Sequence, residues 1–104
     1  MMGNDTIRAL TMPKFGLTMK EGKIAKWSVA EGGTLSKGDE VADIETDKIT
    51  NALEAPVAGL LRRQVVGQDT TLPVGALIGV IADKDVPDDK IDAFISEFKP
   101  EQLS

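Results

Sequence analysis

The sequence contains neither cysteine nor histidine among its 104 residues. Without cysteine the chain can form no disulfide framework and no thiolate metal site. The absence of histidine removes the commonest general base and the commonest metal ligand. Pairs in which histidine activates a serine or cysteine nucleophile are therefore excluded. We predict no catalytic residue and no metal ligand in this chain.

Basic and aromatic residues are also scarce. The formal net charge is −5 at pH 7 and the sequence pI is about 4.6, whereas a nucleic-acid-binding protein usually shows a basic face. Aromatic side chains make up 4% of the chain and are not interleaved with basic residues, so we expect no platform for stacking bases. No apolar run approaches the roughly 20 residues of a membrane span, and the start of the chain lacks the apolar run of a secretory signal. We therefore expect a cytoplasmic protein that binds neither nucleic acid nor membrane.

Short β-prone segments follow one another, separated by turns of glycine, proline and polar residues. They span residues 7–12, 23–29, 41–45, 49–54, 60–66 and 77–82. Many short strands at this spacing, in a chain long enough for one domain, predict an all-β sandwich or barrel. Leu35 stands between two glycine-containing turns and is a predicted core residue. The alternation of apolar residues is broken at Ile24, so we predict a bulge near Gly22 or Ile24.

The decisive organisational feature is an internal repeat. Shifting the chain by 37 positions, which brings Gly22 onto Gly59, aligns the two halves without a gap. The aligned pairs include Gly38 with Gly75, Val29 with Val66, Leu35 with Leu72 and Ile44 with Ile81. Turn glycines and core aliphatic residues determine a backbone path, so the repeat predicts two copies of one strand–turn–strand unit. We expect the copies to pack face to face about a pseudo-twofold axis.

A single lysine, Lys48, lies in the predicted turn between the strands 41–45 and 49–54. A two-stranded tip would hold its Cα still and leave its four-carbon side chain exposed. We predict that Lys48 is covalently modified and carries a cofactor for enzymes outside this chain. Glu45 and Asp47 alone could suggest an acid–base pair or a cation site, but their solvent-facing turn favours charges that steer basic partner sites. The outer acidic residues either extend this acidic face or are simply solvated: Asp39, Glu40, Asp43 and Glu54.

The composition changes after Val86. Pro87 and Asp88 predict a helix start with Asp88 as the N-cap. Four apolar residues recur at the spacing of one helix face: Ile91, Phe94, Ile95 and Phe98. We predict a helix over 89–98, ended by Pro100, that either packs on the sandwich or leads into a further domain. The expected organisation is a disordered segment 1–6, a domain 7–84 and a C-terminal extension 85–104.

Several short motifs resemble those of one family. They are Met12-Pro13-Lys14-Phe15-Gly16, Glu21-Gly22-Lys23-Ile24, Lys37-Gly38-Asp39-Glu40-Val41, Glu45-Thr46-Asp47-Lys48 and Ala55-Pro56-Val57-Ala58-Gly59. Together they resemble the lipoyl domain of the acyltransferase component of 2-oxo-acid dehydrogenase complexes, over residues 7–82. The segments 10–14 and 62–76 look most like the acetoin dehydrogenase type, with a pyruvate or branched-chain complex as the alternative.

This resemblance implies a fold and a site. The fold is a flattened barrel or sandwich of two four-stranded antiparallel sheets, with the modified lysine on a hairpin tip and the chain termini at the far end. Lys48 would be the N6-lipoyl-lysine, with recognition by the residues around it: Glu45, Thr46, Asp47 and Ile49. The loop Phe15-Gly16-Leu17-Thr18 would lie beside the hairpin and be read by a partner. Alternatively, Phe15 and Leu17 cover the end of the barrel.

The resemblance also implies partners. A lipoate ligase or lipoyltransferase would attach lipoate to Lys48. A thiamine-dependent decarboxylase would then acylate the arm reductively, an acyltransferase catalytic domain would pass the acyl group to coenzyme A, and dihydrolipoamide dehydrogenase would reoxidise the dithiol. The cofactor does this chemistry, while the protein supplies position and recognition.

Other interpretations stay open. A biotin carrier would share the fold, but that family flanks its lysine with methionines where this chain has Asp47 and Ile49. A glycine-cleavage carrier and an unmodified hammerhead interaction module are further alternatives. No alanine- and proline-rich linker or acyltransferase domain follows the motifs, so the chain is either a fragment or a stand-alone carrier. We interpret Trp27 as a packing residue and Arg62-Arg63 as a solvated strand face.

Overall fold

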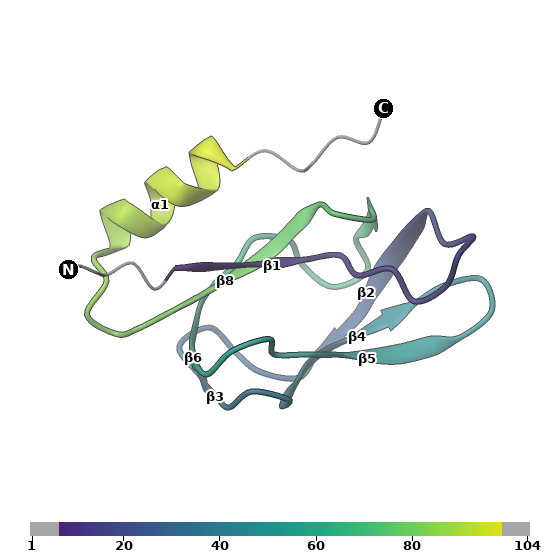
Figure 1. The fold of residues 1–104 in the computed structure, drawn as a ribbon, viewed down its shortest axis with the longest axis horizontal. Coiled ribbons are helices and arrows are strands. Elements are labelled where there is room, and N and C mark those ends of the chain that lie inside the picture. Colours follow the sequence, from purple (N-terminus) through teal and green to yellow (C-terminus); the bar gives the residue numbers. More distant parts are fainter. Residues whose placement is uncertain (1–6, 99–104) are drawn as a thin grey trace.

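The computed structural model describes residues 7–98, which form two four-stranded antiparallel sheets and one short helix (Figure 1). The elements are β1 (Arg8–Thr11), β2 (Glu21–Trp27), β3 (Thr34–Leu35), β4 (Glu40–Glu45), β5 (Thr50–Glu54), β6 (Gly59–Gln64), β7 (Thr71–Pro73), β8 (Leu77–Ala82) and α1 (Asp88–Glu97). One sheet has the order β1-β8-β6-β3 and the other β5-β4-β2-β7. The predicted all-β fold of two four-stranded sheets is therefore confirmed. The segment 1–6, predicted to be disordered, and Pro100, predicted to end the helix, lie outside the described residues.

The predicted pseudo-twofold relation is present in the sheet topology. The repeat places β2, β3 and β4 onto β6, β7 and β8, and the same exchange, with β1 onto β5, turns one sheet order into the other. The pairing of β2 with β4 slips between Ile24 and Lys26, and that of β6 with β8 slips at the matching place, between Leu61 and Arg63. The predicted bulge near Ile24 is thus confirmed, and it occurs twice.

The turns repeat as closely as the strands. Gly32 and Asp69 are matched positions, and both have positive φ, at 90° and 67°. The Gly32 N–H donates to the Leu61 carbonyl at 2.7 Å, and the Asp69 N–H donates to the Ile24 carbonyl at 2.6 Å. Asp is one of the few non-glycine residues that tolerate this conformation, which explains how the second copy keeps the turn without glycine.

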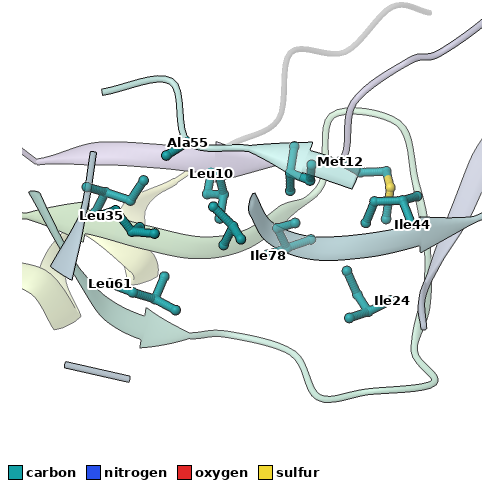
Figure 2. Packing of buried hydrophobic residues seen from close by; sticks show 11 residues of the cluster. Leu10, Met12, Ile24, Leu35, Ile44, Ala55, Leu61 and Ile78 are labelled. Carbon is teal, nitrogen blue, oxygen red and sulfur yellow. The ribbon is translucent and has the colours of Figure 1, made fainter. Parts of the chain in front are cut away.

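The main core lies between the two sheets (Figure 2). Leu35 is buried there, as predicted. Val41 has no partner where β4 pairs with β5, and Ile78 has none where β8 pairs with β1. This irregular register lets both side chains point into the core beside those of their neighbours. Trp27 packs against the edge of this core and its Nε1–H donates to the Val66 carbonyl at 3.1 Å, which confirms its packing role.

A second, smaller cluster joins α1 to the outer face of the β1-β8-β6-β3 sheet (Figure 1). Ile91 is fully buried against Val80 and Ala82 of β8. In the first copy the matched positions are Asp43 and Glu45, so only the second copy has an apolar outer face to cover. The helix packs on the sandwich, as one of the two predicted settings expected.

Two sequence predictions are wrong, one about the start of α1 and one about the arginines that contact it. Its N-cap is Pro87, without a side-chain cap, because the Asp88 carboxylate accepts a hydrogen bond from Arg62 Nη2 at 2.9 Å instead. Arg62 and Arg63 do not form a solvated face. Arg62 Nη1 also donates to the Asp83 carbonyl, and Arg63 Nη2 reaches the Asp92 carboxylate at 3.2 Å. The two arginines thus connect the sheet to the first turns of α1.

Candidate functional site: a lysine at a hairpin tip

The tip of the β4–β5 hairpin is ordered by one threonine. The last paired residues are Glu45 and Thr50, and the Thr46 N–H then donates to the Ile49 carbonyl at 2.8 Å. Thr46 Oγ1 accepts from the backbone N–H of Lys48 at 3.3 Å and of Ile49 at 3.2 Å. These bonds fix the backbone around Lys48 and leave its side chain unrestrained. Figure 1 shows this tip at the end of the molecule opposite the turn that joins β8 to α1.

Lys48 is exposed, as are its neighbours Asp47 and Ile49. In the part of the chain that the structure describes, its ammonium forms no ion pair. Glu45 contacts Lys23 Nζ at 3.9 Å, and the same ammonium lies 3.8 Å from Asp69. Ion pairs this long and this exposed contribute little free energy, so the Glu45 carboxylate stays available to a partner.

The predicted recognition loop lies beside the tip. Phe15 is half-buried and packs on the main core, whereas Leu17 is 95% exposed. The alternative that both side chains cover the end of the sandwich therefore holds for Phe15 and is wrong for Leu17. The loop, Lys48 and the start of β2 line one groove of about 730 Å³.

Met19 also belongs to this site, and the sequence analysis did not identify it. Its Sδ accepts the Phe15 N–H at 3.1 Å, and its own N–H donates to the Gly16 carbonyl at 3.2 Å. These two bonds close the loop 15–19 on itself. A methionine four residues after an aromatic residue carries no motif, so only the folded loop reveals its role.

The outer acidic residues do not gather at the lysine. Glu40 and Glu54 are paired at the end of the hairpin away from Lys48. Asp39 Oδ2 accepts the Ser36 N–H at 2.8 Å and so shapes a turn. Asp43 is half-buried in the middle of β4. Of the acidic residues named from the sequence, only Glu45 and Asp47 line the groove with Lys48, and Glu21 of β2 joins them there.

Over residues 7–98, acidic side chains do not come together in a group of three or more that could hold a metal ion. The helix within the same range is too short and too polar to cross a bilayer.

The structure is a pseudo-symmetric sandwich of two sheets with one lysine exposed on a hairpin tip. These features define a class of protein, the attachment domains, which present one amine to other proteins. A family model named Biotin_lipoyl, described as "Biotin-requiring enzyme", matches residues 8–81. The chain belongs to this biotin/lipoyl attachment family.

Two similar proteins indicate which members of the family this chain resembles. The acetyltransferase component of the acetoin cleaving system of Pseudomonas putida is 50% identical over 95 residues, which is 91% of this chain and 26% of that protein. The corresponding component of Cupriavidus necator is 48% identical over 94 residues, 90% of this chain and 25% of that protein. This chain thus spans about a quarter of each.

A solved structure of a lipoyl domain has a fold similar to that of this chain. The lipoyl domain of the 2-oxoglutarate dehydrogenase complex of Azotobacter vinelandii superposes with a TM-score of 0.60 at 25% identity, covering 72% of this chain and 95% of that one. The expected resemblance to lipoyl domains, and most to those of the acetoin type, is confirmed.

Proposed function

We propose that this chain is a lipoyl carrier domain that accepts lipoate on Lys48 and serves the acyltransferase component of an acetoin-cleaving complex. The observation that carries the proposal is the position of Lys48. Within residues 7–98 its amine is exposed and free of ion pairs, on a tip whose backbone is held by Thr46. The residues fit the group, because the amine has solvent on one side and an open groove on the other.

Each residue of the tip has a separate task. Thr46 holds the lysine Cα, so a modifying enzyme always meets a flexible side chain that starts from the same backbone position. Asp47 and Glu45 steer basic partner surfaces toward it. Amide formation removes the lysine charge, and because Lys48 has no ion partner in the described residues, the folded domain loses no contact. Once attached, lipoate supplies a disulfide that accepts an acyl group and electrons and can be regenerated.

The partners follow from this role. They are a lipoate ligase or lipoyltransferase, a thiamine-dependent decarboxylase component, the acyltransferase catalytic domain and dihydrolipoamide dehydrogenase. The names of the acetoin-system relatives support the acetoin complex over the pyruvate alternative, because the two relatives at 50% and 48% identity both carry that name. The chain itself would catalyse none of these steps, and it would act in the cytoplasm.

Intact mass spectrometry after co-expression with a lipoate ligase, in medium containing lipoate, tests the attachment site. We expect one lipoyl adduct per chain, lost in Lys48→Ala. Lys84→Ala is the matched control, because Lys84 is an exposed lysine in the turn that follows β8, at the pseudo-symmetric position of the tip. That variant should keep its adduct.

Three results would contradict the proposal. They are an adduct that survives Lys48→Ala, an adduct lost in Lys84→Ala, and a biotin adduct in place of lipoate when a biotin ligase is present. The last would assign the chain to the biotin branch of the family.

A further inference from the structure

The pseudo-twofold symmetry fails at the lysine end of the molecule. Pro13 and Pro56 are matched by the topology, and Gly22 and Gly59 by the repeat. Between them the first copy has residues 14–21, whereas the second copy has only residues 57–58. The longer connection in the first copy folds beside the hairpin tip and forms one wall of the groove next to Lys48. A connection as short as 57–58 cannot build such a wall at the other end.

The groove has the volume of a small-molecule site and a mixed lining, in which three large apolar side chains lie among charged and polar residues. Its volume of about 730 Å³ lies within the range of roughly 300–1,000 Å³ that is typical of ligand pockets. Phe15 and Met19 line it from the loop, and Ile49, which is 48% exposed, lines it from the hairpin. Lys48 is itself a lining residue, so a group attached to its amine starts at the groove.

We propose that the lipoyl group on Lys48 docks in this groove, against Phe15 and Met19, between encounters with partners. This inference rests on the proposed function. A tether converts docking into an intramolecular event with an effective concentration in the millimolar range, so weak contacts suffice to populate it. A thioether and an aromatic ring are suited to the sulfur atoms of a dithiolane, since sulfur contacts with aromatic rings are favourable.

The loop is preorganised for this contact. The Phe15 N–H to Met19 Sδ bond and the Met19 N–H to Gly16 carbonyl bond hold the loop backbone and the Met19 side chain in place without a ligand. Both side chains also pack on the main core. Docking therefore orders little besides the arm, which keeps its entropic cost low.

The groove is open to solvent and partly polar, with Glu45 and Lys23 also on its lining. Docking is therefore reversible, and a partner can draw the arm out. While docked, the disulfide has one side covered by Phe15 and Met19, which hinders the approach of small reductants. A disulfide docked half of the time reacts about twofold more slowly, because reactivity scales with the undocked fraction.

Methionine-methyl NMR on the lipoylated 104-residue chain tests the docking, with mass spectrometry first confirming the adduct. We expect the Met19 methyl signal to shift on lipoylation and to show nuclear Overhauser contacts to the dithiolane protons. Met12 is buried in the core and serves as the internal control, with a much smaller shift. A confirmed adduct with an unmoved Met19 signal and no such contacts would overturn the docking and leave the proposed function intact.

A kinetic measurement gives a second readout. Reduction of the lipoyl disulfide by a water-soluble phosphine should be about twofold or more slower in the lipoylated chain than in free lipoamide. Phe15→Ala and Met19→Ala should bring the rate back toward that of lipoamide. Val65→Ala, which truncates an exposed aliphatic residue outside the groove, should not. Equal rates for lipoamide and the unsubstituted lipoylated chain would also overturn the docking.

Discussion

Thr46 and Lys48 share the work of the hairpin tip at the scale of single residues. The lysine supplies the amine, but the threonine hydroxyl, by accepting two backbone N–H groups, makes the position of the lysine Cα reproducible. Asp47 is exposed beside it, and Leu17 stands on the neighbouring loop with 95% of its surface exposed. A large apolar side chain held so far out has no packing role in this molecule, which suits contact with a partner.

Leu17→Ala and Asp47→Asn should each slow reductive acylation by the thiamine-dependent component without lowering the melting temperature. Burying a leucine at an interface stabilises it by roughly 1.5–3 kcal/mol, so kcat/KM should fall about tenfold or more for Leu17→Ala. For Asp47→Asn the loss should shrink as salt is added, because the charge acts by steering. The readout is the acylation rate of purified, fully lipoylated protein.

Val65→Ala is the control for these two variants, since Val65 is also exposed but lies outside both the loop and the hairpin tip. It should acylate at the unsubstituted rate. If Leu17→Ala and Asp47→Asn also acylate at that rate, the proposed recognition surface is wrong.

At the scale of elements, α1 is attached by two kinds of contact of different strength. The ion pairs from Arg62 and Arg63 end on aspartates that are largely exposed, and such pairs contribute roughly 0–1 kcal/mol. Ile91, in contrast, is fully buried against β8. The apolar contact should therefore dominate the docking of the helix, while the ion pairs set its register along the sheet.

Ile91→Ala should release the helix, because truncation of a buried isoleucine costs about 2–5 kcal/mol. Amide hydrogen exchange in residues 88–97 should accelerate strongly, while β4 and β5 keep their protection. Asp92→Asn, which removes one exposed partner of Arg63, should change the exchange of the helix by less than about 1 kcal/mol. Equal effects of the two substitutions would show that the ion pairs, not Ile91, hold the helix.

At the scale of the whole molecule, two glycines related by the pseudo-twofold axis each lie close to an isoleucine side chain of the neighbouring strand. A Cβ added to Gly22 would lie 2.8 Å from Ile44 Cγ2, and a Cβ added to Gly59 would lie 2.8 Å from Ile81 Cγ2. Gly22 would also crowd Met12 and Met19, which link the core to the loop. The glycines are needed where a strand passes over the branched side chain of its neighbour.

Gly22→Ala should destabilise the domain by about 1–3 kcal/mol, the usual cost of overpacking a core. Gly67→Ala is the matched control, because an added Cβ there meets nothing within 4 Å and the backbone has no positive φ. That variant should be neutral or more stable by up to about 1 kcal/mol, since alanine reduces the entropy of the unfolded chain. Chemical denaturation of both variants measures the difference, and equal midpoints would show that the β2 strand can move away.

Much of the architecture follows from the sequence, because glycines and aliphatic residues recur at a constant spacing and the same backbone path satisfies them twice. The repeat predicted the exchange of sheets, and the alternation broken at Ile24 predicted the bulge. The strands β3 and β7 were not predicted, since their two or three paired residues are too few to show a period. The exposure of Lys48 followed from its place in a turn between two strands.

By itself, the sequence determined an all-β sandwich or barrel with a lysine in a turn between two strands, because local spacing and turn residues encode both, and the resemblance to lipoyl domains added the two four-stranded sheets. Only the tertiary structure decided what depends on segments far apart in the chain. It bound Asp88 to Arg62 instead of capping the helix, and it placed Arg63 under α1. It also placed Met19 in the lining of the groove next to Lys48, an arrangement that no spacing encodes because it requires β2 and β4 to pair.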